Sequence, residues 1–214
     1  MVPSDSRGSR PRIALEICVE SAEGAAAAIA GGCDRIELCA ALALGGLTPS
    51  AGLVAAVLDV ARPAGVPVRA MVRPRPGGFD YDAADLALAR REAAALLAAG
   101  VQGLVFGVTR GGRLDRQALA DWRAALPGAP AVSGVPAAPA GLTLHRAIDV
   151  VDDPVAAVEE AVALGFDHIL TSGGAASAPA GAATIARMVA PAGLIAATGV
   201  AAVHGSASEP AAVE

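Results

Sequence analysis

The sequence contains no lysine, and all sixteen of its basic residues are arginines. This absence excludes any mechanism that needs a lysine Schiff base or a lysine general base. Acidic residues also outnumber basic ones, which gives a net charge of −5. This charge argues against a general role in binding nucleic acid or a membrane surface. Only 2% of the residues are aromatic against 54% that are hydrophobic, so the core must consist of small aliphatic side chains that suit helix-on-sheet packing.

Long apolar runs are also lacking, since Arg, Asp, Pro or Gly repeatedly interrupts the alanine-rich stretches. We therefore expect no membrane span and no secretory signal. Three cysteines, an odd number, are typical of ligands or core residues in a reducing cytoplasm. We predict a disordered N-terminal tail over 1–12, one domain over 13–207 and a C-terminal tail over 208–214.

Short β-like runs alternate with longer helical runs from residue 13 onward. The expected strands are 13–18, 35–38, 66–72, 103–107, 141–145, 168–172 and 201–205, and the expected helices are 21–31, 49–62, 83–99, 115–125, 152–164 and 178–190. Ser21, Thr48-Pro49 and Asp152-Asp153-Pro154 are expected helix starts. Repeated βα units predict parallel strands with right-handed crossovers, and seven such strands favour a TIM-type (β/α) barrel over a doubly wound sheet.

The first two strands carry polar residues on one face only. Glu16 and Cys18 alternate with aliphatic residues in the first strand, and Glu37 and Cys39 do so in the second. In a barrel the aliphatic face meets the helices and the other face points inward. The strand-end residues should therefore line the C-terminal mouth, where barrel active sites lie.

Other expected strands end in similar chemistry. The candidate residues for binding an anionic ligand are Arg73, Arg75, Arg146, Thr171, Ser172 and His204, and the candidates for catalysis, if the protein is an enzyme, are Glu16, Glu37 and His145. Paired arginines suit a carboxylate or phosphate, and a histidine suits acid–base chemistry or metal ligation. A structural ion network, in which Glu16 and Glu37 pair with Arg73, Arg75 or Arg146, is the alternative explanation.

Cys18 and Cys39 occupy comparable places on neighbouring expected strands. Parallel strands lie about 4.8 Å apart, which is close enough for two thiolates to share one soft Cu(I) ion. The alternative is that both are small buried hydrophobic residues. Cys33 lies in a helix-to-strand turn at the opposite rim and does not belong to this pair.

Seven segments in order resemble the motifs of the CutC family: LEICVES, GGCDRIELCAALALGGLTPS, MVRPRPGGFDY, GLVFG, LHRAIDVVDDP, ILTSGG and VHGSA. The resemblance extends from about residue 13 to 207. It implies a cytoplasmic TIM-type barrel that self-associates, with a dimer favoured, and a role in copper homeostasis through Cu(I) binding. Cys18 and Cys39 match the cysteines of two of these motifs. No nucleotide cofactor is expected.

Three departures from the family pattern stand out. Cys33 replaces the usual alanine, 127–141 is longer than the family's link, and the Gly-rich seventh strand and its loop are absent. Only 43 residues follow Thr171, whereas two further βα units would need about 60. We therefore expect a barrel with seven strands or an open seam, and a weakened anion site.

Three functions remain open from the sequence. One is a copper-binding protein that uses Cys18 and Cys39, and another is a barrel enzyme of unknown substrate that uses the Glu/His/Arg ring on a small anionic molecule. The third is a structural remnant that has lost its activity.

Overall fold

The computed structural model describes residues 14–126 and 140–189, together with the backbone of 202–206. The strands are β1 (Ala14–Val19), β2 (Arg35–Leu38), β3 (Val68–Met71), β4 (Gly103–Phe106), β5 (Thr109–Arg110), β6 (Arg113–Leu114), β7 (Gly141–Leu144), β8 (His168–Ile169) and β9 (Ala202–Ser206). The helices are α1 (Ala22–Ala30), α2 (Ala51–Ala61), α3 (Ala83–Ala99), α4 (Arg116–Ala124), α5 (Pro154–Ala163) and α6 (Ala182–Val189), with 3₁₀ turns η1 (Leu42–Leu44) and η2 (Arg146–Val150). Every strand and helix expected from the sequence is present: β2 and α3 have the expected bounds, β1 and β9 are shifted by one residue, and the others are shorter.

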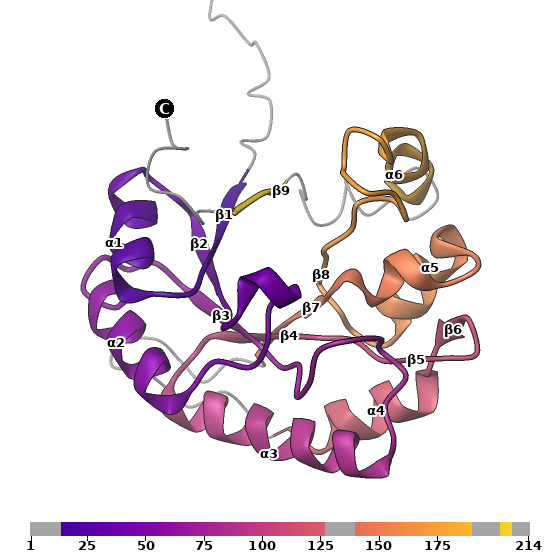
Figure 1. Ribbon diagram of the computed structural model, residues 1–214, viewed down its shortest axis with the longest axis horizontal. Helices are drawn as coiled ribbons and strands as arrows, with labels where there is room; N and C mark the ends of the chain where they lie inside the picture. The colour runs from indigo at the N-terminus through magenta and orange to yellow at the C-terminus, as the bar shows by residue number, and fades with distance from the viewer. Residues whose placement is uncertain (1–13, 127–139, 190–201, 207–214) are drawn as a thin grey trace, which may run out of the picture.

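Seven strands form one parallel sheet in the order β8-β7-β4-β3-β2-β1-β9. The sheet curls, and the helices follow one another around its outside (Figure 1). Within the described residues β8 pairs only with β7 and β9 only with β1, so the two end strands of the sheet do not pair with each other. The prediction of an incomplete TIM-type α/β barrel is therefore confirmed. The separate antiparallel hairpin β5-β6 was not predicted, because each of its strands is only two residues long.

Helix starts follow local capping chemistry. Ser21 accepts a hydrogen bond from the Gly24 amide, and Asp153 caps α5 with Pro154 in the first turn, as expected. Helix α2 begins later than expected, because its N-cap is Ser50 and not Thr48. The Thr48 hydroxyl instead accepts a hydrogen bond from the Arg73 amide at 2.8 Å and donates one to Glu92 at 2.6 Å. Thr48 therefore joins the end of β3 to helix α3.

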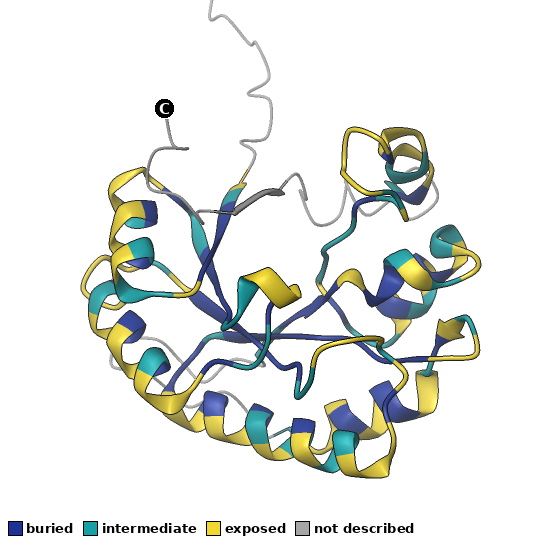
Figure 2. Ribbon diagram, viewed as in Figure 1, coloured by how far each residue is buried: buried dark blue, intermediate teal, exposed yellow. Residues whose placement is uncertain are grey.

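The two faces of the sheet divide as the alternation predicts. Ile17, Val19, Ile36 and Leu38 belong to the core that the helices cover, and the helices turn their buried sides inward (Figure 2). Cys18, Cys39, Met71 and Val105 form a separate buried cluster on the inner face. The inner face is therefore distinct from the aliphatic core.

Charged side chains fill the inner face below that cluster. Arg69 is 7% exposed and donates hydrogen bonds to both carboxylate oxygens of Asp167, at 2.8 and 2.9 Å, and to the Thr143 hydroxyl at 2.7 Å. Burial opposes the charge of Asp167, but hydrogen bonds from His168 and Arg69 outweigh it and hold the pKa of Asp167 well below its usual range. Bidentate pairing of this kind compensates the desolvation of Arg69.

Glu16 belongs to the same layer. It pairs with Arg35, whose Nε donates to the carboxylate at 2.9 Å, and Arg35 also contacts His168 at 3.2 Å. The expected pairing of Glu16 with Arg73, Arg75 or Arg146 is therefore wrong. The reason is register, because Arg35 lies directly opposite Glu16 on the neighbouring strand.

Two further expectations concern segments outside the described residues. These are the two tails at 1–12 and 208–214, and most of the insert at 127–141. None of the helices in the described residues combines the length and apolarity that crossing a bilayer requires.

Gly103→Ala is expected to destabilise the fold, because a Cβ there would lie 2.6 Å from the Gly141 carbonyl oxygen and 2.9 Å from Arg69 Cγ. Overpacking of this kind costs about 1–3 kcal/mol of unfolding free energy, which denaturant titration measures. The matched control is Gly52→Ala in α2, where a Cβ meets nothing within 4 Å. That control should gain about 0.5–1 kcal/mol. Equal effects of the two substitutions would contradict the tight fit around Arg69.

Candidate functional site

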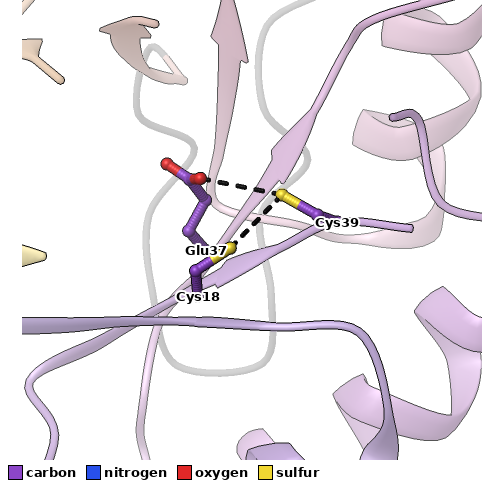
Figure 3. A group of neighbouring side chains, drawn as sticks. All are labelled: Cys18, Glu37 and Cys39. Carbon is purple, nitrogen blue, oxygen red and sulfur yellow. Dashed lines mark hydrogen bonds between the residues drawn. The ribbon is translucent and has the colours of Figure 1, made fainter. Parts of the chain in front are cut away.

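Two cysteine sulfurs meet at the C-terminal end of β1 and β2. Cys18 Sγ lies 3.5 Å from Cys39 Sγ, and the Cys39 thiol donates to Glu37 Oε1 at 3.6 Å (Figure 3). The strand register places Cys18 opposite Glu37, so the two cysteines differ by two residues in register and are not level. They meet diagonally, since strands in a curled sheet are tilted and staggered.

Cys18, Glu37 and Cys39 form a compact buried group. One ligand atom from each lies within 4.8 Å of the other two, and all three residues are buried. Hydrogen bonding with Cys18, burial and the charge of Glu37 together raise the pKa of the Cys39 thiol well above its usual value. Cys39 is therefore protonated at neutral pH in this state, and a metal would have to displace its proton.

A tight loop after Cys39 closes over the sulfurs. Ala40 and Leu47 form an antiparallel bridge, and Gly45 and Gly46 adopt positive φ angles of 86° and 82°. A Cβ at Gly46 would lie 3.1 Å from Cys39 Sγ, and one at Gly45 would lie 3.1 Å from a terminal nitrogen of Arg73. Both glycines are thus required by backbone conformation and by close approach to the site.

A cavity of about 270 Å³ opens beside the thiols. Its lining comprises Cys18, Glu37, Cys39, Leu42, Gly45, Met71, Arg73, Phe79, His145, Arg146 and Leu170. The lining therefore combines the sulfur group with two buried nitrogen-bearing side chains and several apolar ones. This volume is much larger than a single metal ion needs.

Arg73 is held in place by main-chain carbonyls. Its terminal nitrogens donate to the carbonyl oxygens of Leu44, Gly46 and Gly77, at 2.9, 3.1 and 2.8 Å. The guanidinium carbon lies 5.1 Å from the centre of the Phe79 ring. The Nε atom is buried and has no hydrogen-bond partner among the described residues.

His145 is 2% exposed and stands at the end of β7. Its Nδ1 accepts a hydrogen bond from the Ala147 amide at 3.2 Å, so in the neutral ring the proton lies on Nε2. Nε2 is buried and has no partner within the described part of the chain. Burial, and then the charge of Arg73, lower the pKa of His145 to about 4 against the opposing influence of Glu37.

The ring of His145 fits because residue 107 is glycine. A Cβ on Gly107 would lie 2.7 Å from His145 Nδ1. The Phe79 ring packs against the other side, with its centre 4.7 Å from that of the imidazole. His145 is therefore held in one orientation by packing and by the Ala147 amide.

The loop after β8 binds an internal anion, the Asp149 carboxylate. Thr171 and Ser172 donate hydroxyl hydrogen bonds to Asp149, and the Ser172 and Gly174 amides donate to it at 3.0–3.1 Å. Burial opposes the charge, but these bonds and Arg146 lower the pKa of Asp149. The loop predicted to hold an external anion thus already holds this carboxylate.

The other four site residues predicted from the sequence do not gather in one place. Arg146 lines the cavity, but its guanidinium contacts Asp149 and Ser172. Arg75 lies outside the lining, because Asp85 and the carbonyl oxygens of Gly78 and Asp80 bind its side chain. Glu16 lies in the layer below. His204 is opposite Glu16 in the backbone register, and its side chain is outside the description.

The sequence interpretation missed several residues that matter for the site. Phe79, Leu42 and Leu170 line the cavity, yet they come from loops where strand alternation gives no signal. Arg69, in the layer below the cavity, was also missed. A charged residue inside the short strand VRAM was a usable signal for Arg69, because it shares a face with Met71.

A model of the CutC family matches residues 13–204. A CutC protein of Sinorhizobium medicae (strain WSM419) is 50% identical over 180 residues, which cover 84% of this chain and 67% of the relative. A human protein named copper homeostasis protein cutC homolog is 36% identical over 189 residues, covering 88% of this chain and 64% of the human one. The matched part therefore spans about two thirds of these relatives.

A solved CutC structure from Streptococcus agalactiae superposes with a TM-score of 0.77 at 25% identity. The superposition covers 91% of this chain and 98% of that one. Structures of a 2,3-dimethylmalate lyase, at 13% identity and a TM-score of 0.52, share the fold alone.

Stability should fall as the pH drops from 7 to 5, because His145 has a folded pKa of about 4 against about 6.5 unfolded. A lowered folded pKa contributes stability that is complete above the unfolded value and is lost as the pH falls toward the folded one. The contribution lost over this range is about 2 kcal/mol. Denaturant unfolding of wild type and His145→Phe at both pH values measures it. An identical pH slope in the variant would contradict this account.

Proposed function

The chain belongs to the CutC family, and we propose that it binds Cu(I) through Cys18 and Cys39. One observation carries the proposal: two buried sulfurs from neighbouring strands lie 3.5 Å apart at the edge of a cavity. Soft thiolate ligands favour Cu(I) over hard cations such as Mg²⁺ or Ca²⁺.

The donor set fits a monovalent soft ion. Glu37 supplies a carboxylate oxygen beside the sulfurs and already accepts the hydrogen bond of Cys39. Binding would displace the thiol protons, and the positive charge of Arg73 in the same lining would offset part of the resulting negative charge. Cys18 and Cys39 would hold the ion, while Arg73 and the glycine loop would keep the thiols in place.

The family relationship supports the same assignment. The human relative carries the name of a copper homeostasis protein. The three cysteines of this chain all lie in the described residues and form no disulfide, which is compatible with the reducing compartment expected from the sequence. A cytoplasmic location and self-association into a dimer are parts of the proposal that the family resemblance implies.

The test is an anaerobic Cu(I) titration against a competing chelator. Wild type is expected to bind one equivalent, and Cys39→Ala is expected to lose at least about a hundredfold in affinity, because one of two thiolate ligands is gone. Cys33→Ala is the matched control, since Cys33 is also buried but belongs to the helix-covered core. That control should bind like wild type.

Two results would overturn the copper assignment. One is a wild type that never competes with the chelator. The other is a Cys39→Ala variant whose affinity matches that of Cys33→Ala. Thermal unfolding of each variant without metal separates lost ligation from lost folding.

A further inference from the structure

We propose that the cavity beside the thiols binds a small monocarboxylate through the Nε–H of Arg73 and the Nε2–H of His145. Both side chains line the cavity, and they are 6% and 2% exposed. The two nitrogens differ from the sulfur ligands of the proposed copper site, and both sites share one cavity.

Two buried donors without acceptors are the first argument. In the described residues neither Arg73 Nε nor His145 Nε2 has a hydrogen-bond partner of good geometry, and the buried Tyr81 hydroxyl beside the Arg73 side chain has none either. A buried donor left unsatisfied costs about 1–3 kcal/mol, so native structures rarely keep two of them around one cavity. A ligand oxygen that accepts from both would remove this penalty.

The tautomer of His145 decides what kind of ligand atom fits. Since Nδ1 accepts from the Ala147 amide, Nε2 carries the proton and faces the ligand as a donor. A donor at Nε2 suits a carboxylate oxygen and cannot ligate a metal or accept a substrate proton without losing the Ala147 bond. His145 therefore serves as a binding residue.

Phe79 packs beside both donor side chains in the cavity lining. Its ring packs against the His145 imidazole at 4.7 Å and against the Arg73 guanidinium at 5.1 Å, measured to the Phe79 ring centre. Phe79 is half-buried and follows two glycines in a loop.

The surrounding charges and surfaces select the ligand class. Arg73 is the cation that meets the ligand, and Glu37 in the same lining disfavours a second negative charge. The guanidinium of Arg146 is already bound to Asp149. Leu42, Met71 and Leu170 provide an apolar wall. A singly charged carboxylate with a short hydrocarbon tail matches this environment better than phosphate does.

Histidine ring NMR on the wild-type protein is the direct test. The chain has only three histidines, so with ¹⁵N-labelled rings the His145 Nε2 signal can be assigned by comparison with His145→Phe. Titration with sodium butyrate should shift that signal in a saturable way. Neither 1-butanol, which lacks the charge, nor inorganic phosphate should reproduce the shift at equal concentration.

Calorimetry supplies the second readout. His145→Phe, which keeps an aromatic ring beside Phe79, should bind butyrate at least about tenfold more weakly, because one bond to a charged group is lost. Cys33→Ala, whose residue lies in the helix-covered core and outside the cavity lining, should bind butyrate as wild type does. This control separates loss of the donor at His145 from a general loss of folding.

Three outcomes would overturn the monocarboxylate site. These are no saturable shift at His145 in the wild type, equal affinity in His145→Phe, and a response to phosphate or 1-butanol that matches the response to butyrate. Loss of copper binding with butyrate binding intact would refute only the copper assignment.

Discussion

The inward face of a curled parallel sheet is the constraint on which this structure depends. Side chains on that face leave water and converge from all strands, so each polar group needs a partner or a ligand. In this chain the lower layer satisfies the requirement internally. Arg69 and Asp167 form a bidentate pair, Arg35 pairs with Glu16, and two glycines make room for Arg69.

The layer of inward-facing groups around the cavity is only partly paired. The two thiols and Glu37 form a hydrogen-bonded chain, whereas Arg73 Nε and His145 Nε2 have no acceptor among the described residues. Rigid support surrounds these groups: main-chain carbonyls hold Arg73, and the Ala147 amide with Gly107 positions His145. A preorganised but incompletely paired layer is what a binding site requires.

The contrast with the loop after β8 is instructive. Its amides and hydroxyls would suit an external anion, yet the Asp149 carboxylate accepts from them. Recognition of the pattern Thr-Ser-Gly-Gly was sound as local chemistry, since the loop does bind an anion. The sequence pattern could not show where η2 lies in the fold. The position of η2 brings the Asp149 carboxylate into the loop.

The sequence by itself determined the order of strands and helices, the two-faced alternation of β1 and β2, the missing βα unit and the family. These features are local, because they follow from periods of two and 3.6 residues and from motif spacing. Only the tertiary structure decided which polar groups meet. Strand register paired Glu16 with Arg35, stagger brought Cys18 and Cys39 together diagonally, and the ion pair with Asp85 held the Arg75 side chain outside the cavity lining. Register and tilt depend on the whole curled sheet, so no single segment contains them.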